Sequence, residues 1–246
     1  MKTKFFTVRM ITEIGLLLGI MLLMNITRVG YIPIGPINAT IMHIPVIIGA
    51  ILRGPKVGAI LGLGFGLTSW FQAMQGASVT SFIFINPLIS IVPRVIMGWL
   101  TGFIAGSFAK KTEKSVYRWA VGFWVVLLIA MSAYVVRSIV RGETYWTSLV
   151  LLGVVAIAFA VTLFYDKGKN IGSSFAAAIG TMTNTFLVMG LIYVFYAEAY
   201  MLAIGLTPDQ ALATVVTICV VNGLPEMILA VVISTPVCAA LKKRMK

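Results

Sequence analysis

The chain is poor in charged residues, and acidic residues are the scarcest of them. Charged residues make up 11% of its 246 residues, whereas a typical soluble domain carries about 25%. Hydrophobic residues make up 60% of the chain, and its mean hydropathy is +1.02. These values exclude a water-soluble globular domain, and the high apolar content also excludes a disordered or fibrous chain.

Cysteine is nearly absent. Cys219 and Cys238 lie in one apolar run, and on a single helix they would be about 28 Å apart. They therefore cannot form a disulfide bond with each other. Two cysteines so far apart do not form a metal site either, so we expect both to be unreactive helix residues.

Motifs for catalysis are missing as well. The sequence contains neither the G-x-x-x-x-G-K-[ST] phosphate loop of ATPases nor the H-E-x-x-H motif of zinc proteases. Asp166 and Asp209 lie at the ends of apolar runs, which does not fit the embedded aspartate pair of an intramembrane protease. His43 is the only histidine, and one histidine does not make a metal site. We therefore expect no enzymatic activity, no metal and no cofactor.

Long apolar runs dominate the chain instead. A transmembrane helix needs about 20 apolar residues, and only helices or closed barrels satisfy the backbone in lipid. The runs lack the alternating pattern of barrel strands. We therefore predict an all-α, polytopic transmembrane helix bundle in a single integral membrane domain, 1–246, with the last run kinked at its prolines. The eight runs are roughly 5–27, 38–53, 56–75, 83–109, 117–137, 146–165, 171–198 and 210–241.

Basic residues are in excess, with a formal net charge of +12. In a soluble protein this surplus would indicate a nucleic-acid partner, but here the basic residues lie between apolar runs. With the N-terminus in the cytoplasm, fifteen of the nineteen fall in cytoplasmic segments and three in outer loops, while Arg94 falls within a run. Because cytoplasmic loops are rich in Lys and Arg, we predict both termini in the cytoplasm, an even number of spans, a multi-pass cell-membrane protein and no nucleic-acid partner.

The segment 28–40 interrupts this pattern. It holds two prolines and two glycines within ten residues, which excludes a helix. It is nevertheless apolar and is predicted to lie outside. We expect it to fold back over the bundle as a lid, with an interfacial linker as the alternative.

Polar side chains within the spans are candidates for function, because each is costly in lipid unless it has a partner. Arg94 lies about eleven residues into its run, and a four-residue spacing places Asn86, Ser90 and Arg94 on one helix face. A buried guanidinium needs an anionic partner or carbonyl oxygens. Arg94 therefore contacts an anionic ligand, pairs with Glu226 or extends its side chain toward the membrane interface.

Three further polar groups lie near or within the runs. Glu226 lies one helical turn after Asn222, and it can bind a ligand, titrate as a proton site or form an interhelical hydrogen bond. His43 is expected to be a hydrogen-bonding residue in the wall of a site, with a pH switch as the alternative. The remaining candidates are Thr181, Asn184 and Thr185 in the seventh run and Asn38 beside the second.

Glycines recur at helical spacing in two runs. Gly54, Gly58, Gly62 and Gly66 are four residues apart, and such ridges let helices approach closely. We expect this ridge to pack within the chain. The GxxxG pair in the first run, Gly15 and Gly19, is expected to face another subunit. In the same run Glu13 is expected to pair with Arg9.

Together these motifs resemble the substrate-binding S components of energy-coupling factor (ECF) vitamin transporters, and look most like the pantothenate-specific members. The resemblance covers residues 5–110 and 170–241. Members of this family usually have six helices, so residues 112–168 are read as an inserted two-helix hairpin. The segments that carry the resemblance are Ile34-Gly-Pro-Ile-Asn-Ala-Thr-Ile-Met-His-Ile-Pro, Gly54-Pro-Lys-Val-Gly-Ala-Ile-Leu-Gly, Asn86-Pro-Leu, Pro93-Arg-Val-Ile-Met-Gly, Gly180-Thr-Met-Thr-Asn-Thr and Asn222-Gly-Leu-Pro-Glu.

The resemblance implies a six-helix core and a function in uptake. The chain would capture a vitamin from outside, pantothenate first, and deliver it to the cytoplasm. Its implied partners are a membrane-embedded coupling protein, docked on Gly15 and Gly19, and two cytoplasmic ATPases. Arg94 suits the ligand's carboxylate, and amide side chains suit its amide and hydroxyls. The candidate substrate-binding residues are Asn38, His43, Asn86, Arg94, Thr181, Asn184, Asn222 and Glu226.

Other functions stay open at this point. A proton- or sodium-coupled secondary carrier would use Glu226, although the two halves of the chain show no inverted repeat. An S component for a different vitamin fits the same residues. An intramembrane enzyme is disfavoured by the missing motifs, and a purely structural membrane protein by the clustered polar residues.

Overall fold

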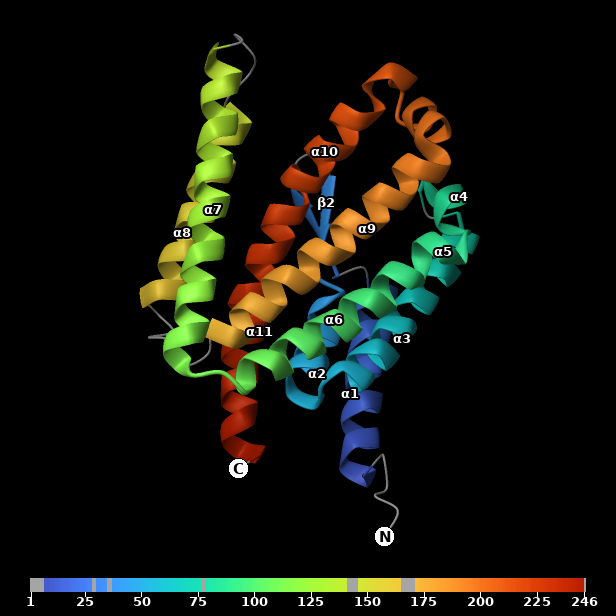
Figure 1. The fold of residues 1–246 in the computed structure, drawn as a ribbon. Helices are drawn as coiled ribbons and strands as arrows, with labels where there is room; N and C mark the ends of the chain where they lie inside the picture. Colours follow the sequence, from blue (N-terminus) through green and yellow to red (C-terminus); the bar gives the residue numbers. More distant parts are fainter. Residues whose placement is uncertain are drawn as a thin grey trace.

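Long apolar helices make up most of the molecule (Figure 1). The computed structural model describes residues 7–27, 30–34, 37–76, 78–140, 146–164 and 171–245. In these ranges, six helical segments are long and apolar enough to cross a membrane, which confirms the polytopic all-α prediction. The elements are α1 (Val8–Ile26), β1 (Tyr31–Ile34), β2 (Ile37–Thr40), α2 (Ile44–Arg53), α3 (Pro55–Met74), α4 (Ser81–Phe84), α5 (Pro87–Ser90), α6 (Val92–Ala109), α7 (Glu113–Val140), α8 (Trp146–Phe164), α9 (Ile171–Ala203), the 3-10 turn η1 (Pro208–Gln210), α10 (Ala211–Val221) and α11 (Gly223–Met245).

The second predicted run, 38–53, differs most from the prediction of a membrane-spanning helix. Its first residues belong to strand β2, and α2 has only ten residues. Ten residues rise about 15 Å, half the hydrocarbon core of a bilayer, so α2 does not cross alone. Pro45 lies in its first turn, and Gly54, with φ +88°, ends it.

The segment predicted to be non-helical contains a short antiparallel hairpin. Strand β1 pairs with β2, with Tyr31 opposite Thr40 and Ile34 opposite Ile37. Strand β2 lies against α11. Residues 28, 29, 35 and 36 are outside the described part of the chain, so the lid stays a prediction.

Helices α3 and α6 form the most extensive helix pair of the bundle. A methyl group added to Gly58 would overlap the backbone carbonyl of Gly98, and one added to Gly62 would overlap the carbonyl of Arg94. The glycine ridge of α3 therefore lets the two backbones touch. This confirms that the ridge packs within the chain.

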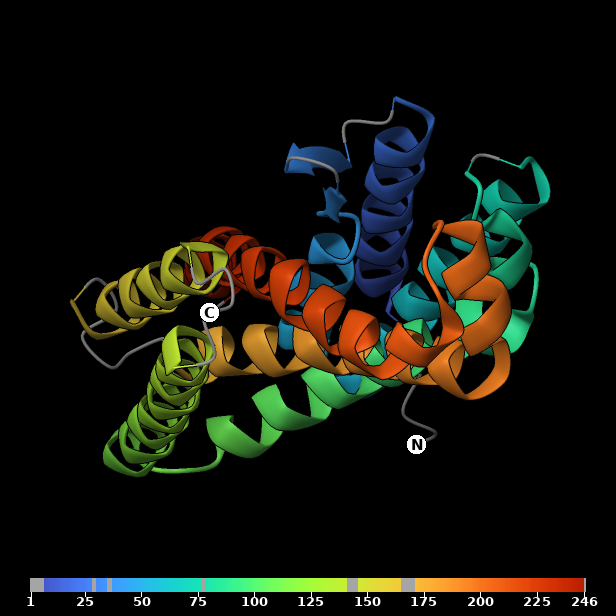
Figure 2. The ribbon, with the colours of Figure 1, turned by 90° about the horizontal axis from the view of Figure 1, so that it is seen from above.

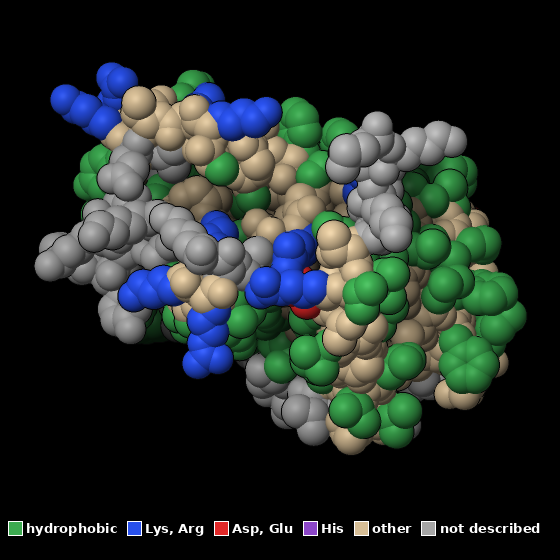
Figure 3. All heavy atoms as spheres, turned by 90° about the horizontal axis from the view of Figure 1, so that it is seen from below, with side chains coloured by type: hydrophobic (Ala, Val, Ile, Leu, Met, Phe, Trp, Pro, Cys, Tyr) green, Lys and Arg blue, Asp and Glu red, His purple; other side chains and the backbone are tan. Residues whose placement is uncertain are grey.

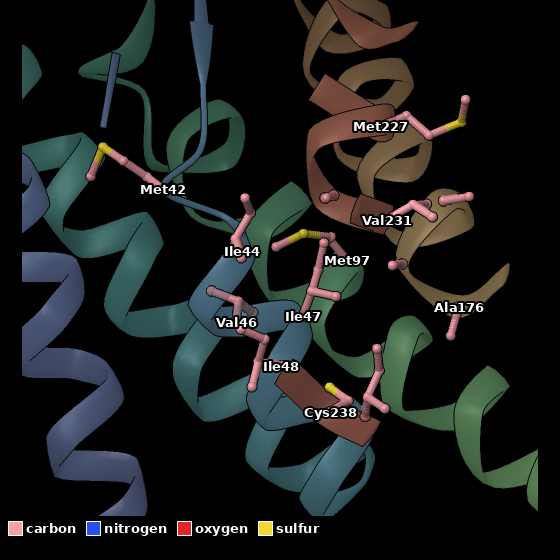
Figure 4. Close-up of a cluster of buried hydrophobic side chains, with 14 of the residues drawn as sticks. Met42, Ile44, Val46, Ile47, Ile48, Met97, Ala176, Met227, Val231 and Cys238 are labelled. Atoms are coloured by element: carbon pink, nitrogen blue, oxygen red, sulfur yellow. The ribbon is translucent and has the colours of Figure 1, made fainter. Parts of the chain in front are cut away.

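Helix α2 lies in the middle of the hydrophobic core (Figure 4). Its residues from Ile44 to Ile51 are all buried. The side chain of Ile47 points toward Met97 of α6 and lies near Val231 of α11 in the close-up. The core thus joins the first part of the chain to the last, and it places the beginning of α2 beside α11.

The last apolar run is broken rather than only kinked. It divides into α10 and α11 at Asn222, three residues before Pro225. A proline ring excludes the carbonyl four residues before it, here that of Val221, the last residue of α10. Pro236, the second predicted kink, lies inside α11. Helix α9 has its own break, because Tyr196 is non-helical with φ −139°.

Helices α7 and α8 lie side by side at one edge of the bundle in both views (Figures 1 and 2). Aromatic side chains attach them to the remaining helices. The rings of Phe123 and Phe175 are 5.3 Å apart, and those of Phe108 and Phe175 are 5.0 Å apart, linking α6, α9 and α7. Trp124 and Phe159 continue the chain of rings into α8. The pair is therefore packed onto the bundle.

Helix α1 begins, and α11 ends, at the same end of the bundle (Figure 1). Lys and Arg side chains gather on this face (Figure 3). At the beginning of α1, Glu13 accepts hydrogen bonds from Arg9 at 3.2 Å and from two nitrogens of Arg53. The predicted Arg9–Glu13 pair is confirmed, and Arg53 is an additional partner that ties α1 to α2.

Candidate functional site

The candidate site is built around Glu226, in the first turn of α11. Its side chain is 6% exposed. The backbone N–H of Thr40, at the end of β2, donates a hydrogen bond of 2.8 Å to a Glu226 carboxylate oxygen. A carboxylate of the last helix thus holds the hairpin that precedes α2, across 186 residues of sequence.

Arg94 lies near this carboxylate. Its side chain is 7% exposed and is within electrostatic range of Glu226. The guanidinium donates a hydrogen bond to the carbonyl of Ile89, and its Cζ lies 5.6 and 5.5 Å from the ring centroids of Phe65 and Phe84. Carbonyl and cation–π contacts suit a buried cation, and the geometry fits both an anionic ligand and attraction to Glu226.

His43 joins the same network from the turn before α2. Its side chain is 1% exposed, and its ring is hydrogen-bonded to the backbone of Thr40. The other ring nitrogen, Nε2, has no hydrogen-bond partner among the described residues. Thr40 therefore connects His43 to Glu226.

Helix α9 contributes the predicted Thr and Asn patch. Thr181 donates to the carbonyl of Ala177 at 3.0 Å, and Thr185 donates to the carbonyl of Thr181 at 3.3 Å. Asn184 is 8% exposed, and its Oδ1 has no hydrogen-bond partner in the described part of the chain. Thr185 of this patch lies against the beginning of α11, because a side chain added to Gly223 would meet it.

The four-residue spacing predicted that Asn86 and Arg94 share a helix face. The structure shows that they do not. Asn86 is the N-cap of α5, where its Oδ1 accepts from the N–H of Leu88 at 3.0 Å. Its Nδ2 donates to the hydroxyl of Tyr196 at 3.3 Å. Pro87 and Pro93 start two separate helices on either side of Ile91, so the three polar residues do not lie on one continuous helix.

Two more candidates occupy the margins of the site. Asn222 caps α10 and links it to α11, since its carbonyl accepts from the N–H of Glu226 at 3.2 Å. The side chain of Asn38 is outside what the structure describes, and only its place in β2, opposite Pro33, is given.

Sequence reasoning missed two kinds of contributor. Thr40 acts through its backbone N–H, which no side-chain pattern reveals. Phe65 and Phe84 flank Arg94, but in an apolar chain two phenylalanines carry no recognisable signal.

The arrangement can bind a small polar molecule. It combines one cation, one carboxylate, an imidazole and an amide, all buried within an apolar bundle. The described residues include no group of three or more His, Cys, Asp or Glu side chains able to hold a metal ion. The fold and the site thus define a multi-pass membrane protein with a buried polar cluster between helices.

The chain belongs to the family of substrate-specific components of ECF transporters. The family model, described as "ECF transporter, substrate-specific component", matches residues 9–118 and 115–238. This confirms the resemblance seen in the sequence motifs. The members of this family are transporters and not enzymes, and the chain is a multi-pass protein of the bacterial cell membrane.

Two curated relatives are similar to the chain. One is the pantothenic acid transporter PanT of Lactococcus lactis subsp. cremoris, 27% identical over 208 residues, which are 85% of this chain and 80% of that protein. The other is the pantothenate transporter PanT of Leuconostoc mesenteroides subsp. mesenteroides, 33% identical over 106 residues, which are 41% of this chain and 50% of that protein.

Proposed function

We propose that the chain captures pantothenate outside the cell and delivers it to the cytoplasm as the vitamin-binding subunit of an ECF importer. The observation that carries this proposal is the cluster of buried Arg94, Glu226 and His43, joined through the backbone of Thr40, inside a bundle of the substrate-specific family. Pantothenate is the proposed substrate because both relatives are named as pantothenate transporters.

The chemistry of the cluster matches this ligand. Pantothenate carries a carboxylate, an amide and two hydroxyls. Arg94 supplies the cation for the carboxylate, and the amide and hydroxyls find partners among the neutral polar side chains. The proposed substrate-binding residues are Asn38, His43, Asn86, Arg94, Thr181, Asn184, Asn222 and Glu226.

Energy must come from partners in this proposal. A membrane-embedded coupling protein would dock on α1, and two cytoplasmic ATPases would drive the cycle. Helix α1 supports such a docking role, because a side chain added to Gly15 or Gly19 meets no atom within 4 Å. The same face exposes Val8, Ile11, Leu16 and Leu23. The basic face in Figure 3 would then lie in the cytoplasm, with both termini on that side.

The hairpin of α7 and α8 is proposed to be an insertion into the six-helix core, within one integral membrane domain. Its residues, about 112–168, would separate the core segments 5–110 and 170–241. Supporting this, α7 and α8 pack on each other and lie at the edge of the bundle. They do not contribute a residue to the polar cluster described above.

Calorimetry on the purified chain tests the proposal. Pantothenate is titrated first, then a panel of other vitamins, all without ATP. We expect nanomolar to low-micromolar binding of pantothenate. Tight binding of a different vitamin would keep the S-component function and replace the substrate, whereas no binding of any vitamin would contradict the proposal.

One observation favours a second candidate function. Glu226 is a buried carboxylate in the membrane-spanning part of the chain, and such groups serve as proton or cation sites in secondary carriers. A carrier of a small polar molecule would accumulate its substrate without partners, driven by an ion gradient.

A further inference from the structure

Two buried acceptor atoms of the candidate site lack a hydrogen-bond partner. They are Nε2 of His43 and Oδ1 of Asn184, considering the part of the chain that the structure describes. Their residues are 1% and 8% exposed. More than nine in ten buried polar groups in proteins have a partner, and each exception needs a reason. His43 and Asn184 both belong to the polar site, whereas Ser234, whose Oγ is also buried without a partner among the described residues, lies away from it.

The hydrogen bonds of Thr40 define which nitrogen of His43 is the acceptor. The N–H of Thr40 already donates to Glu226 at 2.8 Å. The backbone group of Thr40 left for the His43 ring is therefore its carbonyl, and the ring must donate to it. In a neutral imidazole the second nitrogen is then an acceptor, so Nε2 of His43 needs a donor.

Asn184 has the same need, for a different reason. A side-chain carbonyl oxygen only accepts hydrogen bonds. The hydroxyls one turn away cannot serve it, because Thr181 donates to Ala177 and the neighbouring Thr185 donates to Thr181. The local helix thus offers Asn184 Oδ1 no hydroxyl donor.

We propose that His43 and Asn184 are specificity-determining residues, each accepting a hydrogen bond from a donor group of the ligand. With Arg94 as the cation, the site selects a small anion that carries at least two hydroxyl or amide N–H donors. A ligand with only acceptors would leave both atoms buried and unmatched, at a cost in affinity. The proposal rests on the function proposed above, and pantothenate fits it with two hydroxyls and one amide N–H.

Ligand analogues and isosteric variants test this assignment together. The ligands are pantothenate, its dideoxy analogue N-(3,3-dimethylbutanoyl)-β-alanine, and the ester in which oxygen replaces the amide N–H. His43→Phe and Asn184→Leu remove the acceptors at similar size. We expect each variant to bind pantothenate about 10-fold more weakly or worse. Each removed acceptor pairs with a donor that one of the two analogues lacks. For that analogue, we expect the variant to bind no more than about 2-fold more weakly than the wild type does.

Ser234→Ala is the matched control. Ser234 Oγ is also buried without a partner among the described residues, but it lies two turns after Glu226 on α11, about 12 Å along the helix. Its removal should leave pantothenate affinity unchanged. His43→Gln and Asn184→Asp keep an acceptor oxygen and should retain more affinity than the apolar variants.

The wild-type protein alone gives a further test that needs no variant. It must bind pantothenate about 10-fold more tightly, or better, than at least one analogue. Equal wild-type affinity for all three ligands would overturn the assignment. So would variants that bind pantothenate with wild-type affinity, or variants whose affinity falls by the same factor for every ligand. A wild-type chain that binds no pantothenate would overturn the proposed function, and this assignment with it.

Discussion

Arg94 is held by contacts of several kinds at once, and this decides what its removal should do. It donates to the carbonyl of Ile89, lies between Phe65 and Phe84, and feels the charge of Glu226. The carbonyl and ring contacts hold the guanidinium in place, so it is already oriented when an anion arrives. An oriented cation in an apolar site binds an anionic group more strongly than one in water.

Arg94→Ala should therefore weaken pantothenate binding by about 10-fold or more, because a hydrogen bond to a charged group contributes about 1.5–3 kcal/mol. Calorimetry on the purified variant measures the change. Arg94→Lys keeps the charge but loses the planar guanidinium. Its affinity for pantothenate should lie between those of Arg94→Ala and the wild type. Unchanged affinity in Arg94→Ala would remove this residue from the ligand site.

Thr40 makes the polar cluster dependent on the position of the hairpin. Its N–H reaches Glu226, and its backbone also bonds the ring of His43. A shift of β2 would therefore disturb both side chains together. This is the physical link between the hairpin before α2 and the buried charges of α6 and α11.

Helices α3 and α6 leave no room for added side chains along their contact, because glycines bring their backbones together. A methyl group on Gly98 would overlap the carbonyl of Gly58. Gly98→Ala should therefore destabilise the chain by about 1–3 kcal/mol, the usual cost of overpacking. Equilibrium unfolding in mixed micelles measures the difference.

Gly106→Ala is the control within the same helix. An added methyl at Gly106 meets nothing within 4 Å, and alanine favours a helix over glycine by up to about 1 kcal/mol. This variant should be neutral or slightly more stable than wild type. Equal effects of Gly98→Ala and Gly106→Ala would contradict the close α3–α6 contact.

Helix α1 is the least buried of the long helices, with Met21 its only buried residue. Its glycines face open space. Gly15→Leu combined with Gly19→Leu should spare pantothenate binding, because neither glycine lies near the polar cluster, but should prevent assembly with the coupling protein. Co-purification with the partner subunits measures assembly. If the complex purifies intact, the docking surface lies elsewhere on the chain.

The molecule as a whole has one strongly basic end (Figure 3). The basic residues there close α2, α6 and α11 or open α1, α3 and α7, while Arg137 lies at the other end of α7. A structure that gathers its cations at one end agrees with the charge count made from the sequence. If this basic end faces the cytoplasm, the beginning of α1 lies on the side where the proposed ATPases would bind.

Uptake by the isolated chain separates the two candidate functions at the scale of the whole molecule. Reconstituted alone in liposomes under a proton or sodium gradient, the chain should bind pantothenate without accumulating it. With the coupling protein, the ATPases and ATP, it should accumulate the vitamin. Accumulation driven by an ion gradient alone would contradict the ECF function and favour the secondary carrier, with Glu226→Gln expected to abolish it.

The sequence by itself determined the apolar helices, the non-helical segment before α2 and the glycine ridge of α3. These features depend on local composition and on a four-residue spacing, both of which can be read along the chain. It also supported the family, through motifs such as Asn222-Gly-Leu-Pro-Glu. The positions of Lys and Arg at the ends of the helices could also be predicted from the sequence, because these residues lie between the apolar runs.

Only the tertiary structure decided which polar groups meet. The Thr40–Glu226 hydrogen bond spans 186 residues and uses a backbone N–H, and the Asn86–Tyr196 contact spans 110. Neither has a local signature. Membrane helices are apolar on the face that meets lipid as well as on the face that meets the core, so hydrophobicity does not tell which face turns inward. The packing of α2, α6, α9 and α11 makes that choice and places the buried charges together.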